Sequence, residues 1–310
     1  MASQQMDEIK AVLRQRREDS AGAPEPTVEE ARAAMEEMLG AFPAIEGARN
    51  EEVDAGGVPA EWTYTGPDGD NGPLATLLYL HGGGYTVGSP STHRRLVSSL
   101  CLAGGVKALS VDYRLAPEHP FPAALDDALA AYRWLTGPAG VPASKVVVAG
   151  DSAGGGLAAA LLVALRDAGE TQPAGGYLIS PWTDLAATGE SRRSRASVEP
   201  MLEVAGEAKS ARMYAQSEPL DHPLISPLYA NLSGLAPLFV QVGDHEILLD
   251  DSTRLADAAE GAGVDVELTV WPEAFHVFQM LVGVIPEADE AVSAAGKWIA
   301  DRMAAGGAAG

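Results

Sequence analysis

Lys145-Val-Val-Val-Ala149 runs directly into Gly150-Asp-Ser-Ala-Gly-Gly155, and a long stretch rich in Ala and Leu follows at once. A strand that turns sharply into a helix crowds the backbone at the turn, so small residues two positions on either side of Ser152 relieve the clash. The same turn exposes the serine hydroxyl at the edge of a sheet and aims the free amides of the helix at it. The stretch predicts a nucleophilic Ser152 on a strand-to-helix elbow.

A second interpretation of this stretch is that Ser152 only caps a helix, and that the glycines after it let helix and sheet approach each other. This interpretation accounts for Gly154 to Gly156 but not for Gly150 on the strand side. Because a Gly-x-Ser-x-Gly string arises easily by chance in a chain with 34 glycines, the nucleophile hypothesis rests on the strand-to-helix context.

On both sides of the elbow, from about Leu74 to the end, short apolar runs alternate with longer amphipathic segments. This alternation predicts an α/β fold with a mostly parallel central sheet flanked by helices. Strands are expected over residues 75–80, 106–111, 145–149, 177–179, 237–242 and 266–270, and helices over residues 92–103, 122–136, 153–168, 250–262 and 287–303.

Two segments stand outside the alternation, residues 1–50 and residues 186–221. Each has helical character, around residues 28–39 and 203–216, and neither resembles part of a sheet. Insertions of this kind commonly form a lid over a site at the strand ends. We therefore predict a two-part helical cap from these segments, a catalytic core from residues 51–185 and 222–303, and a flexible tail over residues 304–310.

The composition excludes several partners. The chain has 310 residues, enough for one large core, and 21 Lys and Arg against 43 Asp and Glu give a net charge of −22. Such a charge repels phosphate backbones and anionic membranes, so neither nucleic acid nor a membrane is an expected partner. The short basic cluster Arg192, Arg193 and Arg195 has no interleaved aromatic residues and is interpreted as a solvated stretch.

The sequence also bears on the location of the protein. No apolar run approaches the roughly 18 residues that span a bilayer, and the polar N-terminus lacks the pattern of a secretion signal. The single cysteine, Cys101, cannot form an internal disulfide. We expect a soluble, cytoplasmic protein.

A second glycine-rich motif suggests an oxyanion hole. The strand expected over residues 75–80 ends in His81-Gly-Gly-Gly-Tyr85, where backbone amides can approach a ligand without an intervening side chain. Such amides stabilise the negative oxygen of a tetrahedral acyl intermediate. We assign Gly83 and Gly84 to this role, joined by the amide of Ala153, and regard His81 as an organiser of the loop. A phosphate-binding loop is the weaker interpretation, because no Lys-Ser or Lys-Thr follows the glycines.

Chain order selects the base and leaves two acids. Hydrolases with such an elbow place the acid after the nucleophile and the histidine on a loop after the last strand. His276 alone among the six histidines follows the expected strand at residues 266–270. The acid should follow the preceding strand, where either Asp244 or Glu246 could fix the histidine tautomer. Asp250 and Asp251 are interpreted as residues of the first turn of the next helix.

Together these motifs resemble the hormone-sensitive-lipase-like family of α/β-hydrolases, also grouped as bacterial family IV esterases. The resemblance extends from about Pro73 to Met303 and includes all the motifs in family order. They are His81-Gly-Gly-Gly84, Asp112-Tyr-Arg-Leu-Ala-Pro-Glu118, Gly150-Asp-Ser-Ala-Gly-Gly155, Ser180-Pro-Trp-Thr-Asp184, the acid loop and His276.

The resemblance distinguishes between the two acids. The family acid begins an Asp-x-Leu-x-Asp pattern, and Glu246-Ile-Leu-Leu-Asp250 fits this frame with glutamate in the first position, whereas Asp244 does not fit. The resemblance therefore implies Glu246 as the acid, with Asp244 as the alternative. Val277 stands where the family usually has glycine, in a His-Val-Phe form similar to a bacterial subgroup.

The resemblance further implies cofactor-independent hydrolysis of short- to medium-chain acyl esters by a serine carboxylesterase, without a metal. It also implies a cap built from the N-terminal and inserted segments, and a homodimer joined through the edge of the last strand. Four residues are expected to line the substrate pocket, although such residues are more often simple core: Tyr85, Trp182, Met213 and Tyr214.

Two rival functions use the same fold. An amide or N-acetyl deacylase would need the same residues as an esterase. A non-catalytic receptor for a small ligand would have lost the histidine, and His276 is present.

Overall fold

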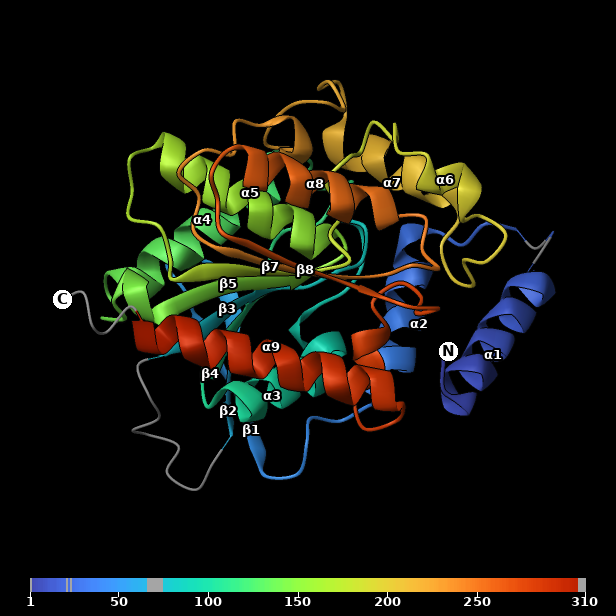
Figure 1. Cartoon of the computed structure of the whole chain (residues 1–310), viewed down its shortest axis with the longest axis horizontal. Helices are drawn as coiled ribbons and strands as arrows, with labels where there is room; N and C mark the ends of the chain where they lie inside the picture. The colour runs from blue at the N-terminus through green and yellow to red at the C-terminus, as the bar shows by residue number, and fades with distance from the viewer. Residues whose placement is uncertain (1, 21, 23, 66–74, 306–310) are drawn as a thin grey trace.

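A sheet of eight strands runs through the centre of the computed structural model (Figure 1), which describes residues 2–20, 22, 24–65 and 75–305. The strand order is β1-β2-β4-β3-β5-β6-β7-β8. From β4 to β8 all neighbouring strands are parallel, whereas β2 is antiparallel to both of its neighbours, β1 and β4. The strands are β1 (Ala48–Asp54), β2 (Pro59–Thr65), β3 (Thr76–Leu80), β4 (Lys107–Val111), β5 (Val146–Asp151), β6 (Gly175–Ile179), β7 (Leu238–Gly243) and β8 (Val266–Trp271).

The six predicted parallel strands are confirmed, but β1 and β2 were not predicted. β1 lies at the edge of the sheet and has no fully buried residue, whereas β2, between β1 and β4, alternates polar and apolar residues although four of its residues are buried. The expectation that residues 1–50 lie outside the sheet is therefore wrong at residues 48–50, which open β1. A buried Glu61 on β2 is tolerated because Arg94 pairs with it.

Helices cover both faces of the sheet (Figure 1): α3 (Pro90–Gly104) and α9 (Pro286–Ala305) on one face, and α4 (Ala123–Thr136), α5 (Ala153–Asp167) and α8 (Leu249–Gly261) on the other. Three short 3₁₀ turns complete the core, η1 (Ala143–Lys145), η2 (Pro227–Tyr229) and η3 (Phe278–Leu281). All five core helices that the sequence predicts are confirmed.

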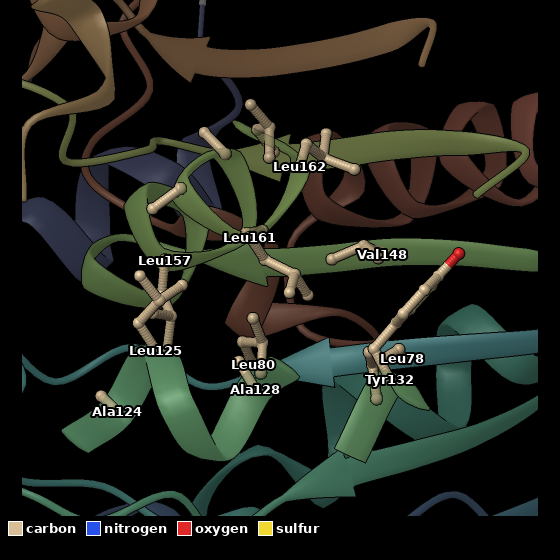
Figure 2. Packing of buried hydrophobic residues seen from close by; sticks show 14 of the residues in the cluster. Leu78, Leu80, Ala124, Leu125, Ala128, Tyr132, Val148, Leu157, Leu161 and Leu162 are labelled. Carbon is tan, nitrogen blue, oxygen red and sulfur yellow. The ribbon is translucent and has the colours of Figure 1, made fainter. Parts of the chain in front are cut away.

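Successive residues of each central strand enter opposite cores. Leu77 and Tyr79 of β3 pack on the side of α3 and α9, whereas Leu78 and Leu80 pack on the side of α4 and α5. Figure 2 shows Leu78 and Leu80 beside side chains of those two helices. Burial of each leucine stabilises the fold by about 2 kcal/mol, and cover on both faces explains why the central strands are apolar on both sides.

The helices outside this arrangement gather at one end of the sheet (Figure 1). We call α1 (Gln4–Ser20), α2 (Val28–Gly40) and residues 186–221, with α6 (Ser191–Ser194) and α7 (Val204–Ala215), the cap segments, after the cap that the sequence predicts from them. Arg17 of α1 joins the two parts of the cap, since its guanidinium donates to the carboxylate of Glu203 at 2.9 Å and to the carbonyl of Glu199 at 3.0 Å.

The N-terminal helix α1 was not predicted, because its sequence is polar on most sides. Met6 and Lys10 are its buried residues. At the other end of the chain, α9 continues to Ala305, so residues 304 and 305 of the predicted tail are helical, and residues 306–310 lie outside the described residues. Among the helices that the structure describes, none combines the length and apolar character needed to cross a membrane.

Candidate active site

Four chain segments meet at one edge of the sheet. Gly83 and Gly84 follow β3, Ser152 follows β5, Glu246 follows β7 and His276 follows β8. These strands run parallel in one sheet, with β6 between β5 and β7, so their carboxyl ends lie on the same side. The carboxyl edge of such a sheet is where α/β proteins place their ligands.

Ser152 occupies the sharp turn between β5 and α5. Its backbone has φ 53° and ψ −122°, a region that side chains rarely adopt. The glycines around it are required by contact: a Cβ on Gly154 would lie 2.0 Å from the carbonyl oxygen of Leu80, and one on Gly150 would lie 2.3 Å from that of Gly154. The strand-side Gly150, which helix capping alone did not explain, therefore makes room for the first turn of α5.

Three side chains form a continuous chain of hydrogen bonds. Nε2 of His276 lies 2.9 Å from Oγ of Ser152, and Nδ1 of the same ring lies 2.8 Å from Oε2 of Glu246. Glu246 is fully buried and His276 is 3% exposed. A carboxylate at Nδ1 favours the tautomer whose Nε2 can accept the serine proton. The structure thus brings together the predicted serine, histidine and glutamate.

The other oxygen of Glu246 is held by two donors. Oε1 accepts the amide of Gly243 at 2.5 Å and the hydroxyl of Ser180 at 2.8 Å. The hydroxyl of Ser180 also accepts the amide of Val277 at 3.3 Å. Ser180 therefore ties the acid loop to the histidine loop, a role that its place in the Ser-Pro-Trp-Thr-Asp motif did not reveal.

Asp244, the alternative acid, has a different partner. Its carboxylate accepts the amide of Glu273 at 2.5 Å, which joins the loop after β7 to the loop after β8. The structure therefore places Glu246 on His276 and uses Asp244 to connect two loops. Asp250 and Asp251 lie in the first turn of α8, as the sequence predicts.

The charges around His276 favour its protonated form. Burial by itself lowers the pKa of His276, but the hydrogen bond and charge of Glu246, with the charges of Glu199 and Asp151, outweigh burial, and the pKa lies above its usual value. Glu199 comes from the cap, and its Oε2 accepts the amide of Ile247 beside the acid at 3.3 Å. An imidazolium formed during a reaction would be stabilised by these carboxylates.

The glycine loop after β3 is fixed beside the serine by a buried network. Oδ1 of Asp151 accepts the amide of Gly82 at 3.0 Å and the hydroxyl of Tyr79 at 2.8 Å, and it lies 3.4 Å from Nε2 of His93. Burial lowers the pKa of His93, but Asp151 outweighs it and the pKa lies above its usual value. The sequence did not reveal Asp151 or His93 as parts of the site, because a lone histidine on a helix carries no signal.

The amides of Gly83 and Gly84 are available to a ligand. Within the described part of the chain, no hydrogen bond engages either amide. Gly83 has φ 118°, and a Cβ there would lie 2.1 Å from the carbonyl oxygen of Val87. The loop therefore depends on glycine for its shape, and the N-terminus of α5 with Ala153 borders the same edge of the sheet.

His81 is positioned as an organiser of this loop. Its ring stacks on Tyr113 with centroids 4.2 Å apart, and its Nδ1 lies 2.8 Å from the carbonyl oxygen of Gly82. Burial, together with the charge of His93, lowers the pKa of His81 to about 3. A ring that stays neutral and enclosed in this way suits a structural role.

Three of the four predicted pocket residues form one aromatic cluster. The rings of Tyr85 and Tyr214 stack with centroids 3.7 Å apart and planes within 3°, and Trp182 lies 6.1 Å from Tyr85. Met213, next to Tyr214 on α7, is half-buried against the same core. The cluster joins the glycine loop to the cap, and its contact with substrate stays a prediction.

Comparison with known proteins agrees with this geometry. Residues 77–280 match the model of a family described as the alpha/beta hydrolase fold. The chain belongs to this family. The predicted α/β-hydrolase fold is therefore confirmed.

Relatives of this α/β hydrolase are named as hydrolases of acyl groups. An acetyl-hydrolase of Streptomyces hygroscopicus is 44% identical over 272 residues, which cover 88% of this chain and 89% of that protein. An esterase of Acinetobacter venetianus is 37% identical over 219 residues, which cover 70% and 72%.

Two similar solved structures are named as hormone-sensitive lipases or as members of that family. An esterase from the bacterial hormone-sensitive lipase family has a TM-score of 0.91 with this α/β hydrolase at 42% identity, covering 98% of this chain and 99% of that one. A hormone-sensitive lipase from a metagenome library has a TM-score of 0.90 at 39% identity, with the same coverage. The resemblance to bacterial hormone-sensitive-lipase-like esterases is thereby confirmed.

Proposed function

We propose that this α/β hydrolase is a serine carboxylesterase that cleaves short- to medium-chain acyl esters through an acyl-enzyme on Ser152. The relatives named as esterases and acetyl-hydrolases support the class of carboxylic ester hydrolases. The observation that carries the mechanism is the hydrogen-bonded series from Ser152 through His276 to Glu246, at 2.9 and 2.8 Å.

In the first half of the reaction, Nε2 of His276 takes the proton of Ser152 as Oγ attacks the ester carbonyl. The carbonyl oxygen becomes negative and accepts the amides of Gly83, Gly84 and Ala153. Each such donor typically lowers the barrier by about 3 to 4 kcal/mol. Glu246 stabilises the imidazolium, which then gives its proton to the leaving alcohol.

In the second half, water replaces the alcohol. His276, neutral again, takes a proton from the water as it attacks the acyl carbon, and the same amides stabilise the second tetrahedral species. Return of the proton to Ser152 releases the acid. The residues named here are sufficient for both halves, and the reaction as drawn requires no cofactor.

An N-acetyl or amide deacylase is the second candidate, because one relative is named an acetyl-hydrolase without stating the bond that it cleaves. The same residues would serve, so kinetics must decide. We expect kcat/KM for p-nitrophenyl acetate to exceed that for p-nitroacetanilide by several orders of magnitude. A comparable or larger value for the anilide would favour the deacylase.

Replacement of the nucleophile tests the mechanism. We expect Ser152→Ala to lower kcat for p-nitrophenyl acetate by about a millionfold, because the substitution removes the hydroxyl that His276 activates to form the acyl-enzyme. Circular dichroism and the Tm serve as controls for folding. Turnover within tenfold of the original chain would contradict the assignment.

A further inference from the structure

The helix α7 brings a carboxylate to the edge of the proposed active site. A Cβ built on Gly84 would lie 3.3 Å from Oγ of Ser210, so this face of α7 lies against the glycine loop. Tyr214, one turn further on, stacks on Tyr85 of the same loop. Glu207 precedes Ser210 by three residues and therefore shares this face.

One oxygen of the Glu207 carboxylate accepts a hydrogen bond and the other does not. Oε2 accepts Nε of Arg192 at 3.2 Å, and the side chain is 9% exposed. Oε1 is buried and has no hydrogen-bond partner within the described residues. A buried charged oxygen without a donor is costly, so an unpaired Oε1 beside a reaction centre indicates a place for a donor that the chain itself does not supply.

An incoming cation would stabilise the charged form of Glu207. The interpretation of Arg192 as solvated is wrong, because its side chain is buried and pairs with Asp251 at 2.6 Å as well as with Glu207. Two carboxylates therefore face one guanidinium. Burial, opposed by Arg192, raises the pKa of Glu207 to about 7, and the charge of His276 is among the influences on it. An incoming hydroxyl or ammonium group would pair with the free oxygen, and an ammonium group would also offset the excess charge.

The part of α7 that carries Glu207 is the more loosely packed part. The buried residues of α7 are Ala211, Tyr214 and Ala215, all in its second half. In the first half, the carboxylate of Glu207 accepts a hydrogen bond from Arg192, which connects α7 to α6. A modest shift of this half would give a bound substrate access to Oε1 while the second half stays packed.

We propose that Glu207 binds a hydrogen-bond donor of the substrate, a hydroxyl or a protonated amine. This donor belongs to the acyl part or the alcohol part of the molecule and lies away from the ester bond. The inference rests on the proposed esterase function and names its substrate class: small esters that carry such a donor, in preference to purely alkyl esters. Glu207 would act as a specificity-determining residue, separate from Ser152, His276 and Glu246.

Matched esters test this proposal. One set places the donor in the acyl part, as methyl esters of β-hydroxybutyrate, β-aminobutyrate and isovalerate. The other places it in the alcohol, as acetates of butanediol, aminobutanol and pentanol. Within each set the members differ by hydroxyl, ammonium or methyl at one position, and acid release is followed at constant pH. The measured quantity is the ratio of kcat/KM for a donor ester to that for its methyl counterpart.

In the original chain we expect this ratio to favour both donors in one of the two sets. Glu207→Leu should lower the ratio by roughly tenfold or more. Glu207→Gln keeps an acceptor but loses the charge, so it should lower the ratio for the amine more than that for the hydroxyl. Arg192 keeps Asp251 in both variants. Glu218→Gln, at an exposed position shortly after the same helix, should leave every ratio unchanged.

Several results would overturn the proposal. Equal ratios in the original chain and Glu207→Leu, in both sets, would show that Oε1 binds no substrate donor. An equal loss for donor and methyl esters would assign Glu207 a purely structural role. If Glu207→Leu fails to fold, an unchanged amine ratio in Glu207→Gln overturns the proposal by itself. Failure of the original chain to hydrolyse any ester, the methyl members included, would instead refute the esterase function.

Discussion

At the scale of single residues, the contacts of Glu246 and Asp244 assign them different tasks. One oxygen of Glu246 meets His276 at 2.8 Å and the other is held by Gly243 and Ser180, whereas Asp244 accepts the amide of Glu273. The two residues follow the same strand, so their positions in the sequence alone did not distinguish them. The Asp-x-Leu-x-Asp pattern of the family favoured Glu246. In space only one of the two carboxylates reaches the imidazole.

Substitution of the two acids should therefore have unequal effects. Glu246→Gln presents an amide to Nδ1 of His276 and disfavours the working tautomer, so we expect kcat to fall by about a thousandfold or more. Asp244→Asn keeps an acceptor for Glu273, so kcat should change by less than about tenfold. Both are measured at saturating ester, with Tm as the control. A larger loss in Asp244→Asn would reverse the assignment.

The raised pKa of His276 predicts the pH dependence. The base must be neutral, and a pKa above 6.5 means that kcat/KM should rise through a midpoint above pH 6.5. The carboxylates whose charges raise the pKa of His276 are Glu246, Glu199 and Asp151, and the charge of His276 in turn acts on Glu207. Glu199→Gln removes one negative charge, which lowers the pKa of the imidazolium, so the midpoint should move to lower pH.

This prediction is measured as kcat/KM between about pH 5 and 9 in the original chain and Glu199→Gln. Arg133→Ala on α4 removes an exposed ion pair with Glu170 and serves as a control for charge changes elsewhere. A midpoint below 6.5 in the original chain, or one that rises in Glu199→Gln, would contradict the description of the site's charges.

Some site residues were predictable from sequence and others were not. Ser152, Gly83 and Gly84 lie in local motifs whose backbone shape requires particular residues, and His276 follows from chain order. Ser180, Asp151 and Glu199 act through contacts with residues 66, 69 and 48 positions away. No periodicity or spacing records such contacts, so they become visible only when the strands are assembled.

At the scale of elements, the cap segments are joined to the core by specific polar contacts. Arg32 of α2 donates to the carbonyl oxygens of Thr86 at 2.8 Å and Ala116 at 3.0 Å, and to the carboxylate of Glu118 at 2.7 Å. Thr86 lies in the loop that carries the proposed oxyanion amides. A helix remote in sequence thus supports the loop that the reaction needs.

Removal of this support should lower stability and activity together. We expect Arg32→Ala to lower the free energy of unfolding by about 1 to 2 kcal/mol, since three acceptors lose their donor. It should also lower kcat more than it raises KM, because the displaced loop carries the amides that stabilise the transition state. Chemical denaturation and ester kinetics measure the two effects. Arg133→Ala should cost no more than about 1 kcal/mol, because its pair is exposed. Equal effects of the two substitutions would show that Arg32 does not support the loop.

The predictability of an element followed the hydrophobic pattern of its sequence. Strands β3 to β7 are apolar runs, whereas β1 at the edge of the sheet is mostly polar and β2 beside it alternates polar and apolar residues, and neither was recognised. The helix α1 was not recognised for a similar reason. Its place in the fold comes from contacts such as that of Ser3 with Glu287 at 2.6 Å, 284 positions apart.

At the scale of the whole molecule, the sheet brings the three proposed catalytic residues together. Ser152, Glu246 and His276 follow the carboxyl ends of β5, β7 and β8, and they meet because these strands run parallel in one sheet with only β6 between β5 and β7. The sequence predicted the sheet and the family, and the family frame predicted the acid. A homodimer, a cytoplasmic location and contact of the aromatic cluster with substrate stay predictions.

Covalent capture of the nucleophile tests this convergence most directly. An organophosphonate ester reacts only with a serine that an adjacent base activates beside amides that hold the negative oxygen. We expect intact-protein mass spectrometry to show one adduct per chain, peptide mapping to place it on Ser152, and ester hydrolysis to be lost in proportion. The account would be contradicted by an adduct on another residue, or by a chain that hydrolyses esters while Ser152 stays unmodified.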